Sequence, residues 1–311
     1  MPTPLVIGVD AGATTTRCLV STLDGEVRDR RGAAGANQNS SGRDLTDTLP
    51  AVLSTIEGEV VGGVVAAAGS AEPAARARAQ AAAETAWRQA GLAGPVAVVT
   101  DLEAAFAAGT PSPDGVLLIA GTGAVAARFA EHAVIRRADG YGWLAGDEGS
   151  AVWLGREAVR AVFRALDGRG PKTILTEHLA ATAGSAEDRA QALIAATIGA
   201  PPATLGRFAP VVGAAAAEGD EVARAVVVEA VAQLLHTLWT VGGGPPVVLG
   251  GGLLLSPGPV ANAVRGGVRT RFGVEPHDAR DGAAGAAALA IARHTGHPVP
   301  DDVHQRLTGG R

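Results

Sequence analysis

The sequence predicts an α/β protein built from two related halves. Apolar runs typical of strands alternate with segments of helical periodicity along most of the 311 residues, which is the pattern of sheets covered by helices. Residues 4–9 form an apolar run that ends in a small-residue turn at 10–14, and residues 116–120 form another that ends in Gly121-Thr122-Gly123. A second strand with an arginine follows each turn. Read as a duplication, this pair predicts two related α/β halves that face one cleft.

The first half begins as a strand meander. Residues 15–23 form the strand after the first turn, and Asp24-Gly25 is a typical hairpin turn that leads into a third strand. Apolar periodicity then predicts, in order, a helix at 44–57, a strand at 60–68, a helix at 73–90, a strand at 96–100 and a helix at 102–108.

The second half is more helical. Residues 124–130 form the strand after the Gly-Thr-Gly turn, and Ser150 is a suitable N-cap for a helix that runs to Leu166. Further helices are expected at about 186–198, 220–239 and 283–294, with a buried strand at 247–249. We therefore place an N-terminal domain at 1–113, a C-terminal domain at 114–295, whose last helix can return to the N-terminal domain, and a tail at 296–311, of which residues 301–311 are expected to be frayed.

Composition excludes several classes of function. A net charge of −5 with 18% charged residues gives no overall attraction to nucleic acid or to an anionic membrane. The single cysteine, Cys18, allows neither an internal disulfide nor a cysteine-only metal site, and we expect it to be buried in a strand. The single lysine, Lys172, lacks the glycine-rich context of a P-loop. With no signal-like N-terminus and no apolar run of about 20 residues, we expect a soluble, cytoplasmic protein.

Three glycine turns are candidate nucleotide sites. In the first two, small residues let backbone N–H groups approach phosphate oxygens, and threonine hydroxyls add donors. The carboxylate of Asp10, before the first turn, suits hydrated magnesium. Each turn alone also fits an ordinary tight turn, whereas the pair predicts a clamp on a triphosphate. The third turn, with Gly251 and Gly252, would let a planar base lie against the backbone. The candidate phosphate residues are Gly12, Ala13, Thr14, Thr15, Gly121, Thr122 and Gly123.

Two further acidic positions are candidates for sugar chemistry. Asp101 lies between a strand and a helix, where a carboxylate either accepts a proton from a substrate hydroxyl or serves only as an N-cap. Glu103 fits a charge in the first helical turn. Asp147 lies in a glycine-rich run at 140–150, and Trp143 of that run offers an apolar wall for a sugar ring. The same run also fits a capped loop around a core tryptophan.

Taken together, these segments resemble the BadF/BadG/BcrA/BcrD ATPase family, and within it the N-acetylglucosamine kinases. Gly-Asp-Glu-Gly-Ser at 146–150 is the most specific match. The resemblance implies the actin-like fold, in which two RNase H-like domains hold ATP in a central cleft. It also implies a magnesium- and ATP-dependent kinase for the 6-hydroxyl of N-acetylglucosamine or a close relative. The matching segments follow the family's order within residues 5–295 and are Asp10–Thr16, Asp101, Ala120–Gly123, Gly142-Trp143, Gly146–Ser150, Gly250–Gly252 and Asp281–Ala286.

The resemblance also implies roles for single residues. Asp101 would be the catalytic base, and Asp10 would hold magnesium through water. Thr14 and Thr122 would face the phosphates, and Gly251 and Gly252 would flank the nucleoside. A homodimer is expected, with a sugar and ATP as ligands and neither nucleic acid nor a membrane as partner. The residues implied to line the sugar site are Asn37, Asp101, Gly142, Trp143 and Asp147.

One departure and several alternatives stay open. Ala124-Val125 stand where many relatives carry a polar pair, so N-acetylglucosamine, glucosamine, N-acetylmuramic acid and glucose all remain candidate substrates, and the nucleotide preference is open too. Activators of radical dehydratases in the same family need two cysteines per subunit for an iron–sulfur cluster, and kinases of the repressor/open-reading-frame/kinase group commonly carry a cysteine-rich zinc motif. Cys18 alone fits neither. A sugar sensor without catalysis is the non-enzymatic alternative.

Overall fold

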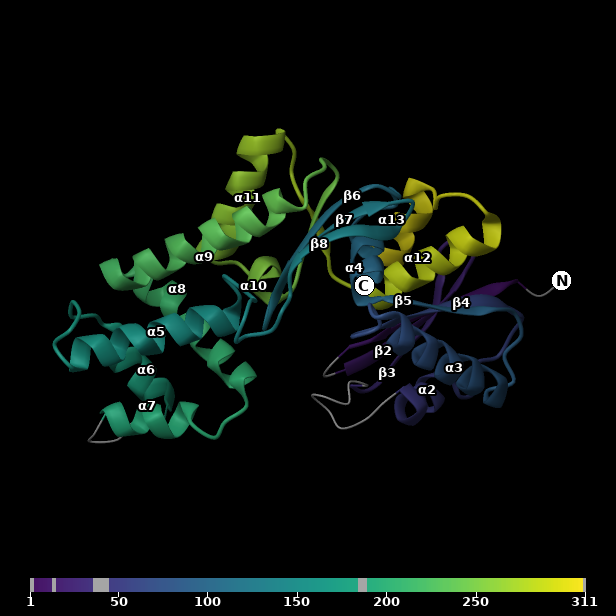
Figure 1. Cartoon of the computed structure of the whole chain (residues 1–311). Coiled ribbons are helices and arrows are strands. Elements are labelled where there is room, and N and C mark those ends of the chain that lie inside the picture. The colour runs from purple at the N-terminus through teal and green to yellow at the C-terminus, as the bar shows by residue number, and fades with distance from the viewer. Residues whose placement is uncertain (1–2, 13–14, 36–44, 184–188, 310–311) are drawn as a thin grey trace. The chain divides into compact units, whose positions relative to one another are not determined.

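The computed structural model describes residues 3–12, 15–35, 45–183 and 189–309, and Figure 1 shows their elements. The chain separates into two compact units, which we call the first unit and the second unit. The first unit contains Met1–Gly115, Phe129–Val134 and His277–Arg311, and the second unit contains Val116–Arg128 and Ile135–Pro276.

The first sheet has five strands in the order β3-β2-β1-β4-β5. Strand β2 pairs antiparallel with β1 and β3, whereas β1 with β4 and β4 with β5 are parallel. Because parallel strands end at the same edge of a sheet, Asp10 near the end of β1 and Asp101 directly after β5 lie at one edge. The strands are β1 (Leu5–Ala11), β2 (Thr15–Thr22), β3 (Val27–Ala34), β4 (Val60–Ala67) and β5 (Val96–Thr100).

Both faces of this sheet are covered by helices. Successive side chains of a strand point to opposite faces. Ile7 and Val9 therefore pack with α2 (Leu45–Leu53) and α3 (Pro73–Gln89) on one face. Val6 packs on the other face with α4 (Asp101–Gly109), α12 (Gly282–Thr295) and α13 (Asp301–Gly309). All three side chains are fully buried, so β1 runs through the middle of a two-sided core.

Helix α12 approaches its neighbours at backbone contact distance. Its buried stretch, residues 283–291, consists of alanine and glycine apart from Leu289 and Ile291. A Cβ at Gly8 of β1 would lie 2.2 Å from the backbone nitrogen of α12 residue Ala287, and one at Gly285 would lie 2.0 Å from the Ala104 carbonyl oxygen of α4. No side chain separates α12 from β1 or from α4 at these points, so the three elements form one tightly packed group.

The second sheet repeats the strand order of the first. Its order is β10-β9-β6-β7-β8, so that the first strand along the chain lies between the second and the fourth in both sheets. The β6–β9 pair is parallel, as is β1–β4. The two related α/β halves predicted from the two glycine turns are confirmed. The strands are β6 (Gly115–Ala120), β7 (Ala124–Ala130), β8 (Ala133–Asp139), β9 (Val247–Gly250) and β10 (His277–Ala279).

The helices of the second unit share one apolar core. By length and composition α9 is apolar enough to cross a membrane, but Val227, Ala230 and Leu234 along one side of it are buried in this core, which accounts for its composition. The helices are α5 (Ala151–Leu166), α6 (Leu175–Ala183), α7 (Arg189–Thr197), the 3₁₀ helix η1 (Pro202–Phe208), α8 (Ala209–Ala217), α9 (Glu221–Thr240), α10 (Gly252–Leu255) and α11 (Pro259–Phe272).

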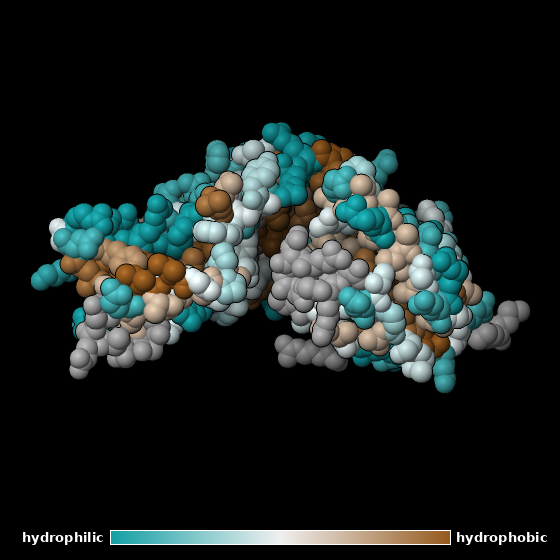
Figure 2. Space-filling model, turned by 60° about the horizontal axis from the view of Figure 1, so that its bottom comes forward, coloured by the Kyte–Doolittle hydropathy of each residue, from teal (hydrophilic) through white to brown (hydrophobic). Residues whose placement is uncertain are grey.

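Large apolar side chains at the surface are mostly scattered. Figure 2 shows one face of the molecule, on which hydrophobic residues form separate patches among hydrophilic ones. Tyr141, Trp143 and Leu144 differ from this pattern because they share one short loop and are 71%, 41% and 78% exposed. This exposed loop belongs to the glycine-rich run that the sequence marks as a candidate site.

Several local predictions are confirmed in detail. Ser150 is the N-cap of α5, and its hydroxyl accepts a hydrogen bond from the Trp153 N–H at 3.1 Å. The Asp24-Gly25 turn joins β2 to β3. Cys18 is 2% exposed on β2, and burial raises the pKa of its thiol to about 12.

The predicted frayed tail is wrong. Residues 301–309 form α13, in which Val303, His304 and Leu307 are buried. The His304 ring donates to the Ala107 carbonyl oxygen of α4 at 2.8 Å. Helix α11 was also not expected, because its three arginines and two glycines weaken the apolar pattern from which helices are predicted.

Candidate functional site

Asp10 lies in a crowded acidic position at the carboxyl edge of the first sheet. Its carboxylate contacts Gly282, the first residue of α12. Burial raises the pKa of Asp10 to about 6, the charges of Asp101 and Asp281 add to the rise, and Arg17 of β2 opposes it. The carboxylates of Asp101 on α4 and Asp281 at the start of α12 therefore both lie within electrostatic reach of Asp10.

The carboxylate of Asp281 already has a hydrogen-bond partner and an ion-pair partner in the first unit. Asp281 is the N-cap of α12, and its carboxylate accepts a hydrogen bond from the Ala283 N–H at 3.1 Å. It also forms an ion pair with Arg30 of β3. These contacts compensate the charge of Asp281 and fix the start of α12 beside Asp10.

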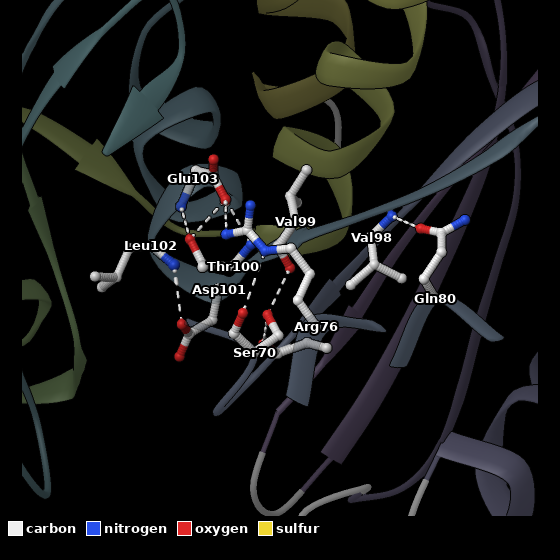
Figure 3. A network of polar contacts seen from close by, with 10 residues as sticks. Ser70, Arg76, Gln80, Val98, Val99, Thr100, Asp101, Leu102 and Glu103 are labelled. Carbon is white, nitrogen blue, oxygen red and sulfur yellow. Dashed lines mark hydrogen bonds and ion pairs between the residues drawn. The ribbon is translucent and has the colours of Figure 1, made fainter. Parts of the chain in front are cut away.

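Asp101 is the first residue of α4, and its carboxylate accepts a hydrogen bond from the Leu102 N–H at 3.0 Å (Figure 3). The N-cap of α4 is Thr100, whose hydroxyl accepts from the Glu103 N–H. The Glu103 carboxylate accepts from the Thr100 N–H at 2.6 Å, which completes a capping box. The alternative in which Asp101 serves as the N-cap is therefore wrong, and Glu103 is a partner in the cap as well as a first-turn charge.

A polar network between α3 and strand β5 holds the segment that carries Asp101 (Figure 3). The Arg76 guanidinium of α3 donates to the Ser70 carbonyl oxygen at 3.2 Å and lies 3.6 Å from the Glu103 carboxylate. The Ser70 hydroxyl is buried and donates to the Val99 carbonyl oxygen at 3.2 Å. The Gln80 side chain of α3 accepts from the Val98 N–H and donates to the Val96 carbonyl oxygen, each at 2.8 Å. Strand β5, and with it Asp101, is thus tied to α3.

The first phosphate-site turn is described in part. The Gly12 N–H donates to the Thr15 carbonyl oxygen at 3.0 Å, which closes a tight hairpin between β1 and β2. Ala13, Thr14 and Asn37 lie outside the residues that the structure describes.

The second phosphate-site turn packs against the third glycine turn. The Gly121 N–H donates to the Gly123 carbonyl oxygen at 2.9 Å, and the Gly121 carbonyl oxygen accepts from the Ala151 N–H of α5 at 2.8 Å. A Cβ at Gly251 would lie 2.4 Å from the Ala120 carbonyl oxygen, and one at Gly121 would lie 3.4 Å from the Gly252 nitrogen. The turns at 121–123 and 251–252 therefore meet backbone to backbone.

Asp147 reaches the same turn from the glycine-rich loop. Its carboxylate accepts a hydrogen bond from the Ala124 N–H at 3.2 Å, and a Cβ at Gly123 would lie 2.8 Å from its Oδ2. Burial raises the pKa of Asp147. The Ala124 side chain is 2% exposed and belongs to the core. At position 124, where many relatives carry a polar residue, the alanine methyl group thus packs in the core. The Ala124 backbone N–H holds the Asp147 carboxylate.

Gly142 and Trp143 lie on the exposed part of this loop. The Trp143 carbonyl oxygen accepts from the Arg156 guanidinium of α5 at 2.9 Å, while its side chain is 41% exposed. The Gly142 carbonyl oxygen accepts from the Gly146 N–H at 2.8 Å, which keeps the loop tight. The alternative of a core tryptophan is therefore wrong.

A cavity of about 610 Å³ opens beside the two packed turns, entirely within the second unit. Gly121, Thr122 and Gly252 are part of its lining, to which residues of α5, η1, α8, α9, α10 and α11 and the segment 256–258 also contribute. Thr122 and Ser256 supply the polar side chains of its lining, which contains no charged residue among the described part of the chain. The volume lies in the range of small-molecule sites, and the lining suits a flat apolar group.

The structure therefore gathers the predicted site residues in two sets. Asp10, Gly12, Thr15 and Asp101 lie in the first unit, and Gly121–Gly123, Gly142, Trp143, Asp147, Gly251 and Gly252 lie in the second. Three residues that the sequence did not assign also belong to these sets. Arg17 and Asp281 act on Asp10, and Asp139 accepts from the Asp147 N–H at 2.7 Å.

Comparison with known proteins identifies relatives among sugar kinases. An N-acetylmuramic acid/N-acetylglucosamine kinase of Clostridium acetobutylicum is 31% identical over 180 residues, which is 55% of this chain and 57% of that protein. An N-acetyl-D-glucosamine kinase of Dictyostelium discoideum is 43% identical over 65 residues, which is 21% of this chain and 20% of that protein. The alignments thus span less than two thirds of the length of either relative.

Solved structures share the fold over nearly the whole chain. A protein of Chromobacterium violaceum, provisionally named an N-acetylglucosamine kinase, matches with a TM-score of 0.69 at 25% identity, covering 92% of this chain and 98% of that one. A glucokinase of the repressor/open-reading-frame/kinase family from Streptomyces griseus, in complex with glucose and AMPPNP, matches in fold with a TM-score of 0.52 at 18% identity, covering 92% and 99% of the two chains. The fold is the actin-like two-domain α/β fold.

A family model settles the relationship at the level of sequence. The model of the BadF/BadG/BcrA/BcrD ATPase family matches residues 7–290. That range begins in β1, ends in α12, and includes every carboxylate and glycine turn described above. The chain belongs to the BadF/BadG/BcrA/BcrD ATPase family.

Proposed function

We propose that this protein is an ATP-dependent kinase that phosphorylates the 6-hydroxyl of N-acetylglucosamine or a close relative. The observation that carries the proposal is the position of Asp101, a carboxylate at the first turn of α4 and at the edge of the sheet that also carries Asp10. Carboxylates at the carboxyl ends of parallel strands are suited to act on bound ligands. The names of the Clostridium and Dictyostelium relatives support the same activity.

Asp101 would act as the base. Its carboxylate accepts the proton of the sugar hydroxyl while the hydroxyl oxygen attacks the γ-phosphorus of ATP. The bond to the bridging oxygen breaks, ADP leaves with that electron pair, and the sugar keeps the phosphoryl group. Phosphoryl transfer needs little covalent help from the protein, so a fixed carboxylate contributes mainly by orientation. The capping box and the β5 network supply that fixed orientation.

ATP would use the glycine turns in place of a P-loop lysine. The phosphates would approach the two small-residue turns, in which the Gly12 and Gly121 N–H groups close the hairpins and the threonine hydroxyls add donors. The residues of these turns are Gly12, Ala13, Thr14 and Thr15 in the first, and Gly121, Thr122 and Gly123 in the second. The nucleoside would enter the cavity of the second unit beside Gly251 and Gly252. Apolar walls and small residues favour stacking of a flat base there.

Magnesium fits the residues around Asp10. The pKa of this carboxyl is raised to about 6 by burial and by two like charges, so a cation at this position would relieve uncompensated charge. Magnesium usually keeps several waters and binds through one or two carboxylates and substrate phosphates, so Asp10 would hold the ion through water. When bound, magnesium would neutralise charge on the phosphates.

The sugar would be held by Asp147 and by the loop around it. A carboxylate accepts hydrogen bonds from two adjacent hydroxyls, and the exposed side chain of Trp143 offers an apolar face for the ring or the acyl group. Gly142 and Asn37 complete the proposed pocket. Glucosamine, N-acetylmuramic acid and glucose are the alternative substrates. A homodimer, a cytoplasmic location and a domain boundary near residue 113 remain part of the proposal.

The test is ADP release with magnesium and ATP against N-acetylglucosamine, glucosamine, N-acetylmuramic acid, N-acetylmannosamine and glucose. We expect N-acetylglucosamine or N-acetylmuramic acid to give the highest kcat/KM. The 6-deoxy analogue of the best substrate should inhibit without being phosphorylated, and turnover of that analogue would exclude the 6-hydroxyl. Sugar binding without ADP release from any member of the panel would instead support the sugar sensor.

A further inference from the structure

Asp139 is a carboxylate that organises the loop carrying Asp147. It is the last residue of β8, and its two oxygens accept three backbone N–H groups. Oδ1 accepts from Gly140 and from Asp147, each at 2.7 Å, and Oδ2 accepts from Glu148 at 2.9 Å. Hydrogen bonds to an ionised acceptor are stronger than neutral ones, so one side chain fixes both ends of the loop.

The loop backbone is built around this side chain. Asp139 has a φ of +63° and Asp147 a φ of +56°, values that residues other than glycine seldom adopt. A Cβ at Gly146 would lie 2.3 Å from Asp139 Oδ1, so glycine at 146 leaves the space that the carboxylate occupies. Two residues held at positive φ need surrounding contacts to maintain them, and the three hydrogen bonds of Asp139 provide these contacts.

Arg137 of the same strand binds the backbone at the start of this loop. Its guanidinium donates to the Asp139 carbonyl oxygen at 3.0 Å and to the Gly140 carbonyl oxygen at 2.5 Å. Asp139 therefore has both its backbone and its side chain engaged. A carboxylate that already accepts three N–H groups is poorly placed to bind a sugar hydroxyl as well.

We propose that Asp139 is a positioning residue for sugar binding, acting through Asp147. It holds the backbone of Asp147 so that the Asp147 carboxylate stays beside Gly123 and Ala124. This inference rests on the proposed function, in which Asp147 binds the sugar. The nucleotide cavity has no lining residue from the loop at 139–148, so the effect should fall on the sugar and spare ATP.

The decisive variant is Asp139→Gly. Glycine adopts the positive φ at no steric cost, so this change removes the carboxylate without adding backbone strain. We expect the KM for N-acetylglucosamine to rise about tenfold, with the KM for ATP changed less than about twofold. Asp139→Asn keeps one carbonyl oxygen for the Asp147 N–H and should give an intermediate KM. Gly146→Ala places a methyl group against the carboxylate and should raise the sugar KM without changing any charge.

Asp220→Ala is the matched control. Asp220 also accepts two backbone N–H groups in the second unit, from Ala223 at 2.8 Å and from Ile174 at 2.9 Å, but as the N-cap of α9. We expect this variant to lower the melting temperature and to leave both KM values unchanged. An unchanged sugar KM in Asp139→Gly, or an equal rise in the sugar and ATP KM values, would overturn the inference while leaving the kinase activity in place.

A second readout separates this inference from the proposed activity. N-acetylglucosamine without ATP should raise the melting temperature of the wild-type protein, and Asp139→Gly should reduce that rise. If the wild type releases no ADP but binds the sugar, the kinase proposal fails and the melting shifts decide the role of Asp139. If it neither turns over nor binds any sugar of the panel, both proposals are rejected.

Discussion

The carboxylate of Asp10 and the first residue of α12, Gly282, are in direct contact. A Cβ at Gly282 would lie 2.5 Å from Asp10 Oδ2 and 2.7 Å from Asp10 Cγ. Real Cβ atoms essentially never lie this close to a non-bonded atom, so a residue larger than glycine at 282 would force Asp10 or the start of α12 to shift. Gly282 is separated from Asp10 by most of the chain, and yet its lack of a side chain leaves the space that the Asp10 carboxylate occupies.

Gly282→Ala should therefore impair catalysis. Because the methyl group must displace either Asp10 or the start of α12, we expect kcat/KM to fall at least about tenfold in ADP release. Gly266→Ala in α11 is the control, since a Cβ there meets nothing within 4 Å. Replacing glycine inside a helix should stabilise this control by about 1 kcal/mol and leave its kcat/KM unchanged. Wild-type activity in Gly282→Ala would show that Asp10 does not need its observed place.

The raised pKa of Asp10 predicts a pH-dependent effect on stability. The folded state binds this proton more tightly than the unfolded chain, so the associated stability is present at low pH and is lost as the pH rises through about 6. A pKa near 6 against the ordinary 3.8 corresponds to about 3 kcal/mol. The side chain of Asp10→Asn carries no charge at any pH. The free energy of unfolding of this variant, relative to that of the wild type, should therefore rise by about this much from pH 4 to pH 8 in urea unfolding without divalent cations. A stability difference independent of pH would contradict the assignment.

Asp101→Asn should separate turnover from binding. An amide keeps the size of the side chain but cannot accept the hydroxyl proton, so we expect kcat to fall by about two to four orders of magnitude. The rise in melting temperature caused by N-acetylglucosamine should persist. Asp302→Asn, at an exposed position of α13, is the control and should keep full activity. Undiminished turnover in Asp101→Asn would remove Asp101 from its role.

The apolar lining of the cavity predicts weak selection of the base. Rejection of a wrong base requires buried polar groups that would be left unpaired, and hydrophobic walls discriminate weakly. Thr122 and Ser256 are the residues with polar side chains in the described lining. We expect kcat/KM for GTP to lie within about a hundredfold of that for ATP in a direct comparison at saturating sugar. A larger preference would reveal a group that reads the edge of the base.

Features encoded by neighbouring residues could be predicted from the sequence. The turn at Asp24-Gly25, the N-cap at Ser150 and the strand-turn-strand starts of both halves depend on a few adjacent side chains. The burial of Cys18 follows from its place in an apolar strand. For the same reason Asp101 could be found, because it directly follows a strand and opens a helix.

Features that depend on distant contacts could not be predicted. Asp139 precedes a glycine like many turn residues, and its role appears only when the N–H groups eight and nine residues later reach its carboxylate. The folding of α13 depends on burial of Val303 and Leu307 against elements far back in the sequence. Its own residues are mostly polar, so the local pattern favoured a disordered end.

The amide of Gln80 has a consequence for self-association. Strand β5 is at the margin of its sheet, where exposed backbone groups can template pairing with a foreign strand. Gln80 occupies the Val98 N–H and the Val96 carbonyl oxygen with the two-point geometry that an added strand would use. One side chain thus occupies one of the hydrogen-bonding positions that an added strand would need, which hinders the cross-strand pairing by which β-proteins aggregate.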